Sequence, residues 1–109
     1  MPFLLFYVTH PDEETAQRVC SHLIDRRLAA CANIFPVASA YWWQGATVRE
    51  DEWEDEWVSV IKTRLDLEKR VEEEIRQVHP YEVPCILRFE ARANDDYEAW
   101  IAAETAASG

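Results

Sequence analysis

The sequence alternates between extended β-rich segments and amphipathic helical segments, and this order restricts the possible folds more than any other feature. Residues 3–9 are an unbroken run of apolar residues and β-formers. Such a run is typical of a strand that is buried on both faces in the middle of a sheet. After Asp12, apolar residues recur at the i, i+3, i+4, i+7 spacing to about Arg27, which predicts a helix with Asp12 as its N-cap.

The middle of the chain predicts two strands that are joined by a hairpin. Residues 30–43 form a long extended stretch, in which Pro36 indicates an edge position or a bulge because proline donates no hydrogen bond to a neighbouring strand. Gln44-Gly45 predicts a turn, and residues 57–63 predict the returning strand. The acidic run at 50–56 is expected to be a solvated hairpin arm, whose charges discourage unwanted strand pairing.

The remaining segments complete a β-α-β-β-α-β order with an extra helix. A helix is predicted at residues 66–78, a strand at 84–92, and a terminal helix after Asn94. Residues 105–109 are expected to fray. This order predicts an α+β fold for residues 1–109 as a single domain: a ferredoxin-like sandwich, with helices on one face of one sheet.

Charge and glycine content exclude several classes of function. Lys and Arg number 11 against 21 Asp and Glu, so the net charge is −10. Such a surface repels phosphate backbones and anionic lipids, and we expect neither nucleic acid nor membrane as a partner. The only glycines are Gly45 and Gly109. A glycine-rich phosphate-binding loop is therefore excluded.

Cysteine usage predicts reduced thiols and a cytoplasmic location. The three cysteines, Cys20, Cys31 and Cys85, are widely spaced and form no C-x-x-C motif. This spacing argues against a disulfide framework and against a structural zinc site. The first eight residues lack a basic region and are too few for a signal peptide or a membrane span.

Four blocks of sequence carry a family resemblance. They are LAACANI at 28–34, YWWQG at 41–45, IKTR at 61–64 and HPYEVP at 79–84. In this order, and followed by Asn94 and Trp100-Ile101, they resemble the CutA divalent-cation tolerance family over nearly the whole chain. The resemblance implies a ferredoxin-like subunit of a tight homotrimer, cytoplasmic in bacteria and linked to tolerance of copper and other divalent metals.

The chain departs from the family pattern in two places. The stretch 45–62, which contains the acidic run, is a few residues longer than is usual. Cys85 stands where the family more often has a carboxylate, and its thiol would add a soft ligand.

The candidate metal ligands are Cys31, His79 and Cys85. Thiolate and imidazole together suit copper, and imidazole also suits zinc, so copper or another divalent cation is the expected cofactor. His79 and Cys85 are six residues apart across a Pro-Tyr-Glu-Val-Pro turn, so the sheet would have to bring them together. In the structural alternative, Cys31 is buried among apolar side chains and His79 bonds to the last carbonyls of its helix.

The other cysteine and histidines are expected to have structural positions. Cys20 lies on the apolar face of the first helix and is expected in the core. His10 precedes a proline and is expected in a turn, and His22 is expected to be solvated.

A second candidate site is a cleft between subunits of the trimer. Its residues are polar and aromatic and come from family-like blocks: Trp43, Lys62, Thr63, Tyr81 and Glu82. Lys62 projects from an apolar strand, so it either lines a cleft that binds a small anion or pairs with a carboxylate, Glu82 or Glu90. In the second case the aromatic residues are interface packing.

No nucleophile–base pair is visible in the sequence, so we expect no enzyme. The favoured function is a non-enzymatic homotrimer that binds divalent metal, copper above all, and supports metal tolerance. One alternative is a PII-like signalling or small-ligand-binding trimer with its site at the subunit interface, although the glycine-bearing phosphate loop is missing. A purely structural trimer is a third possibility.

Overall fold

A four-stranded antiparallel sheet with two helices on one face forms the centre of the computed structural model, which describes residues 1–48 and 53–105. The strand order is β2-β5-β1-β6. These strands are β1 (Phe3–His10), β2 (Cys31–Ser39), β5 (Glu54–Thr63) and β6 (Ile86–Ala91). The helices are α1 (Glu13–Asp25), α2 (Glu68–Val78, after a 3-10 turn at Leu65–Leu67) and α3 (Asp95–Glu104). The predicted α+β class and order of these elements are confirmed.

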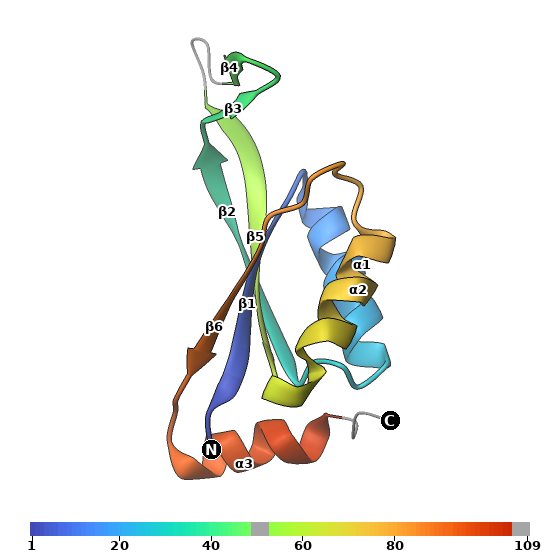
Figure 1. Ribbon diagram of the computed structural model, residues 1–109, viewed down its shortest axis with the longest axis vertical. Helices are drawn as coiled ribbons and strands as arrows, with labels where there is room; N and C mark the ends of the chain where they lie inside the picture. Colours follow the sequence, from blue (N-terminus) through green and yellow to red (C-terminus); the bar gives the residue numbers. More distant parts are fainter. Residues whose placement is uncertain (49–52, 106–109) are drawn as a thin grey trace.

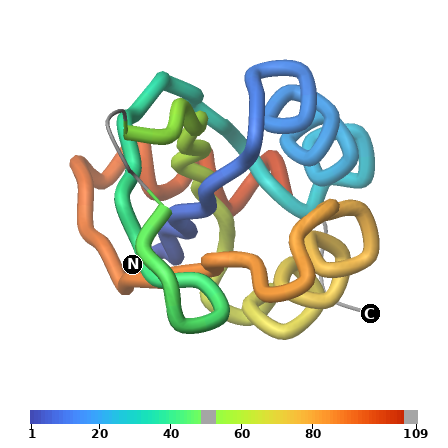
Figure 2. Tube along the Cα trace, turned by 90° about the horizontal axis from the view of Figure 1, so that it is seen from above, coloured from blue at the N-terminus to red at the C-terminus, as the bar shows by residue number. Residues whose placement is uncertain are grey.

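The helices occupy two different places on the sheet. Helices α1 and α2 lie side by side against one face, whereas α3 lies across the end where β1 begins (Figure 1). Figure 2 shows the same pair of helices together on one side of the strands. No helix in the described part of the chain is long and apolar enough to cross a bilayer.

Strand β1 has the internal position that its apolar run predicts, because it pairs with both β5 and β6. Leu4, Phe6 and Val8 are buried and pack in the core beneath α1 and α2. Leu5 and Tyr7 alternate with them and are only half-buried. The expected burial on both faces is therefore wrong for a single chain, since α1 and α2 cover only one face and α3 contacts the other only near Lys62.

Local chemistry determines where α1 begins and ends. Asp12 Oδ1 accepts a hydrogen bond from the Thr15 N–H at 2.7 Å, as expected of an N-cap, and this bond lowers the pKa of Asp12. The helix ends at Asp25, two residues before the predicted end, because Arg27 is left-handed with φ +57°. The Leu28 N–H then bonds to the Leu23 carbonyl, which closes the helix as a left-handed C-cap does.

The extended stretch after α1 divides into two strands. Strand β2 lies at an edge of the sheet, as Pro36 predicted, and the chain then leaves the sheet at Ala40. A second, two-stranded sheet follows, β3 (Tyr41–Trp43) and β4 (Ala46–Val48), which the sequence did not predict. The predicted turn is confirmed: Gln44 and Gly45 have φ of +51° and +82°, the left-handed geometry that a two-residue hairpin needs.

The acidic run is not a solvated arm throughout. Residues 50–52 lie outside the described residues, but β5 begins at Glu54, three residues before its predicted start. Glu56 pairs with Val37 in the sheet and is only 5% exposed, so the expectation of a solvated side chain is wrong there. At the other end of the chain, the predicted fraying of 106–109 also lies outside the described residues. Thr105 is buried, with its hydroxyl on the Ile101 carbonyl at 2.9 Å.

The sheet face opposite α1 and α2, here called the open face, carries exposed apolar side chains. Directly paired residues of antiparallel strands point to the same side. Leu87 pairs with Tyr7, Phe89 pairs with Leu5, and Phe35 lies across β5 on the same side. Phe35, Leu87 and Phe89 are 41%, 49% and 52% exposed. The described chain thus leaves these three apolar side chains of the open face uncovered.

Candidate functional site

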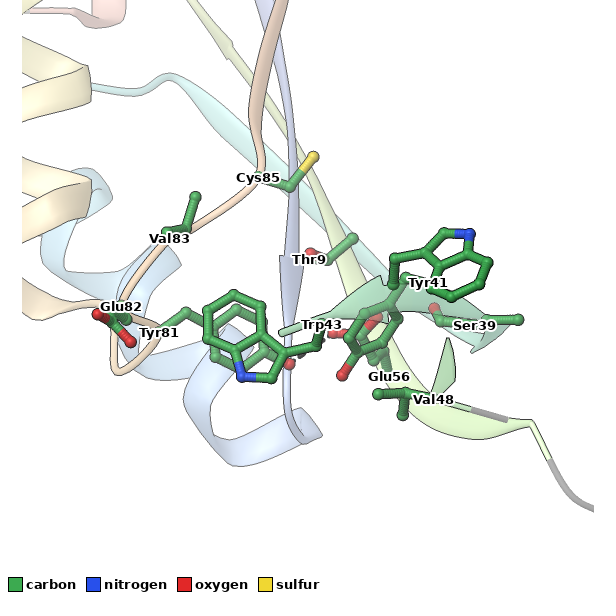
Figure 3. A pocket seen from close by; sticks show the side chains of 12 residues that line it. Thr9, Ser39, Tyr41, Trp43, Val48, Glu56, Tyr81, Glu82, Val83 and Cys85 are labelled. Atoms are coloured by element: carbon green, nitrogen blue, oxygen red, sulfur yellow. Dashed lines mark hydrogen bonds between the residues drawn. The ribbon is translucent and has the colours of Figure 1, made fainter. Parts of the chain in front are cut away.

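A cavity of about 530 Å³ lies between the β3–β4 hairpin and the loop that joins α2 to β6 (Figure 3). Its lining comes from three places: Tyr41, Trp42, Trp43 and Val48 of the hairpin, Tyr81, Glu82, Val83 and Cys85 of the loop, and Thr9 and Glu56 of β1 and β5, with Ser39 and Ala40 beside them. Three of the five predicted cleft residues, Trp43, Tyr81 and Glu82, therefore line one cavity within a single chain.

Two tyrosine–glutamate hydrogen bonds organise the polar part of the cavity. The Tyr81 hydroxyl donates to Glu56 Oε2 at 2.5 Å, and the Tyr41 hydroxyl donates to Glu54 Oε2 at 2.6 Å. Burial and the bond to Glu56 raise the pKa of Tyr81, and the bond to Glu54 raises the pKa of Tyr41 to about 12. Both phenols therefore stay protonated as donors at neutral pH.

His79 holds the cavity loop against β1. Its Nδ1 accepts a hydrogen bond from the Tyr81 N–H at 3.1 Å, so this nitrogen carries a lone pair, and Nε2 donates to the Thr9 carbonyl at 2.7 Å. Burial lowers the pKa of His79, in agreement with a neutral ring. Both ring nitrogens are occupied, which disfavours the predicted role as a metal ligand. The structural alternative, in which His79 bonds to the last carbonyls of its own helix, named the wrong partner. The carbonyl that accepts the bond belongs to Thr9 of β1.

The two candidate thiols lie at different ends of the sheet. Cys31 begins β2 opposite Lys62, which pairs with Leu5, whereas Cys85 lines the cavity beside Thr9. Four residues of β1 separate these levels, about 13 Å along the strand. Burial and Glu56 raise the pKa of the Cys85 thiol. Across residues 1–48 and 53–105, no three His, Cys, Asp or Glu side chains are grouped to hold a metal ion.

Lys62 and Thr63 lie away from the other predicted cleft residues. Lys62 Nζ is 3.2 Å from the Tyr97 hydroxyl and 3.4 Å from Asn33 Oδ1, so within the described residues it pairs with neither Glu82 nor Glu90. Thr63 is fully buried and donates to the Leu28 carbonyl at 2.6 Å. Both residues are at the end of β5 remote from Glu56, about 20 Å along the strand. Within one chain, the predicted cleft set is therefore divided, and a cleft between subunits stays a prediction.

The remaining histidines differ from expectation, whereas Cys20 is buried in the core as predicted. His10 is fully buried rather than in a turn, with Nε2 2.8 Å from Ser59 Oγ and its ring stacked 5.1 Å from that of His79. Burial lowers the pKa of His10 to about 4. His22 is not solvated, because its side chain is only 18% exposed and lies 3.5 Å from Glu74.

Glu56 is the site residue that the sequence interpretation missed. The position of Glu56 in the sequence groups it with the acidic run. However, Glu56, Val58 and Val60 are alternate residues of the chain. Extending this period of two back along β5 would have placed Glu56 on the same side of the strand as both valines. The bond to Tyr81 had no such signal, because 25 residues separate the two.

The comparisons with known proteins identify the family. The family model described as CutA1 divalent ion tolerance protein matches residues 4–104. The chain belongs to the CutA family. The divalent-cation tolerance protein CutA of Pyrococcus horikoshii is 40% identical over 103 residues, which cover 94% of this chain and 97% of the relative. The predicted family resemblance is confirmed.

Solved CutA structures share the fold. The crystal structure of Pyrococcus horikoshii CutA1 superposes with a TM-score of 0.88 at 37% identity and covers 95% of this chain and 99% of that one. A structure described as the periplasmic divalent cation tolerance protein CutA of Archaeoglobus fulgidus has a TM-score of 0.83 at 34% identity, covering 93% and 95%. Within this CutA-like fold, residues of the YWWQG and HPYEVP blocks line the same cavity.

Proposed function

We propose that the protein binds divalent cations, copper above all, and supports metal tolerance as a non-enzymatic homotrimer in the cytoplasm. CutA family membership carries the proposal, because its relatives are named divalent-cation tolerance proteins. The cytoplasmic location is supported by the three cysteines, all in the described part of the chain, which form no disulfide. The Archaeoglobus relative is described as periplasmic, so location is a separate point to test.

The open face supports self-association. Phe35, Leu87 and Phe89 project from three different positions on one side of the sheet. Uncovered apolar patches of this kind mark interaction surfaces. Full burial of each such side chain contributes about 1.5–3 kcal/mol. Trp42, which is 72% exposed on the hairpin, would add further apolar area if the copies also cover this arm.

A metal site in this proposal draws donors from more than one copy. Cys31 lies on the open face, since it pairs with Lys62 and Lys62 pairs with Leu5. Association through this face would bring Cys31 thiols to the interface, and thiolates are suitable ligands for copper. Cys85 is the second candidate donor, with the Glu56 carboxylate beside it. A bound metal would deprotonate the thiol in spite of its raised pKa.

Native mass spectrometry of the reduced protein during copper titration tests both parts of the proposal. We expect trimers with a fixed number of copper ions, and loss of this uptake in Cys31→Ser or Cys85→Ser. Cys20→Ala removes a buried thiol and is the matched control, and His79→Ala should retain copper. Monomers at micromolar concentration would contradict the trimer. Unsaturated adducts that are equal in all variants would contradict the metal site.

The cavity itself favours a second candidate function, a small-ligand-binding module analogous to PII proteins. Cavities of 300–1,000 Å³ with aromatic walls and few polar groups are typical of ligand sites. The described lining has no lysine or arginine but contains Glu56 and Glu82. Nucleotides are therefore poor candidates. A thermal-shift screen with ATP, ADP and AMP checks this point, because a shift of several degrees would favour a PII-like role.

A further inference from the structure

The cavity has the chemistry of a site for a cation that is not a metal ion. Tyr41, Trp43 and Tyr81 present aromatic rings to it, and Glu56 and Glu82 supply carboxylates (Figure 3). Trp42 also lines the cavity. An anion is excluded by the two carboxylates and by the absence of basic side chains from the described lining. A divalent metal would need at least three suitable donors, and no such group occurs in the described ranges.

The Glu56 carboxylate is the strongest indication of an absent partner. Its residue is only 5% exposed and lines the cavity, and Oε2 accepts the Tyr81 hydroxyl. In the described chain, no cationic side chain forms an ion pair with Glu56, and Oε1 accepts no hydrogen bond. Charges on largely buried residues are normally paired, and Oε1 is accessible from the cavity, so a bound cation can pair with it.

The aromatic walls select the kind of cation. Aromatic faces attract ammonium groups, most strongly when the group is stripped of water, and cages of such rings recognise quaternary ammonium ligands. Trp43 comes from the hairpin and Tyr81 from the loop after α2, so a ligand that touches both would meet rings from two elements. Glu56, which also lines the cavity, would supply the counter-charge.

We propose that this cavity binds a small organic ammonium ion, held between Trp43 and Tyr81 with its positive charge facing Glu56. The proposal goes beyond metal tolerance and does not depend on it. Cys85 and Glu56 line this cavity and are also proposed metal donors, so only copper binding at Cys31 can fail separately from ammonium binding here.

Choline and its neutral isostere 3,3-dimethylbutan-1-ol test the proposal on the full chain in metal-free buffer. We expect saturable choline binding, about tenfold or more tighter than binding of the alcohol, which corresponds to about 1.4 kcal/mol. Calorimetry gives the affinity, and a concentration-dependent shift of the Trp43 indole N–H resonance gives the location. Equal affinity for the two probes, or no shift at Trp43, would overturn the proposal.

Two variants test whether the charge of Glu56 and the ring of Trp43 contribute to choline binding. Glu56→Gln should weaken choline binding about tenfold while leaving the alcohol unchanged, and Glu73→Gln, an exposed change of the same charge on α2, should change neither. Trp43→Leu should weaken choline more than the alcohol, because it keeps apolar contact but removes the ring. If Glu56→Gln fails to fold, the comparison of choline with the alcohol and the Trp43→Leu variant still test the proposal. Loss of both probes to the same extent in Trp43→Leu would contradict a cation-specific site.

Discussion

The Tyr81 hydroxyl and the Glu56 carboxylate, 25 residues apart in sequence, are joined by a hydrogen bond of 2.5 Å. This bond connects the loop after α2 to the beginning of β5. It also places a phenol and a buried carboxylate at the same cavity wall. This one contact therefore contributes both to the position of the loop and to the chemistry of the cavity.

Tyr81→Phe should destabilise the fold by about 1–3 kcal/mol, because it leaves the buried Glu56 carboxylate without its donor. Urea denaturation at pH 7 measures the change in the free energy of unfolding. Tyr41→Phe removes a similar bond, to the more exposed Glu54, and should cost less than about 1 kcal/mol. Equal losses in the two variants would show that burial of Glu56 does not matter.

His10 should make stability fall as the pH drops. Its pKa is about 4 in the fold against 6.5 ordinarily, so the unfolded chain binds the proton more readily between these values. The contribution is fully present above pH 6.5 and decreases as the pH falls to 4, by about 3 kcal/mol in total. Denaturation midpoints at pH 7, 5.5 and 4.5 should fall more steeply for the wild type than for His10→Gln. Parallel profiles would contradict the assignment.

Glu98 should protect the fold down to lower pH. Hydrogen bonds from Arg92, foremost, and from the Ala93 N–H lower the pKa of Glu98 to about 2 from 4.5. Its contribution is present above pH 4.5 and is lost as the pH falls to 2. Glu98→Gln should therefore lower the melting temperature at pH 6, and the difference from wild type should shrink towards pH 2. A difference independent of pH would mean that packing, not charge, is what Glu98 supplies.

Phe89→Asp should dissociate the proposed trimer, because it places a charge in the middle of the open face. Light scattering after size exclusion should then give the mass of one chain where the wild type gives three. Ile24→Asp is the control, since Ile24 is also an exposed apolar residue but lies on α1, which covers the opposite face. Dissociation by both substitutions would point to general unfolding instead of a specific interface.

Local rules predicted the elements that depend on neighbours in sequence. The Asp12 cap, the edge position of Pro36 and the Gln44-Gly45 turn each follow from the backbone chemistry of a few residues. The break at Ala40 was missed because β-formers continue through Tyr41–Trp43, and only pairing with β4 directs that segment out of the main sheet.

The candidate site was harder to predict from the sequence, because strand register determines which of its residues lie close together. Cys31 begins β2 and Cys85 immediately precedes β6, but the strand pairing places them at different levels of the sheet. His79 was assigned to its own helix, whereas its partner is the Thr9 carbonyl, 70 residues away. Hydropathy patterns contain no information about such pairings.

The imidazole ring of His79 joins the loop that lines the cavity to strand β1. His79 offers an acceptor to the Tyr81 N–H and a donor to the Thr9 carbonyl, on opposite sides of a rigid five-membered ring. Asparagine reaches only as far as Nδ1 and glutamine only as far as Nε2, and no other side chain provides both groups at this separation. Every replacement at position 79 therefore loses at least one of these two hydrogen bonds, whatever ligand the cavity receives.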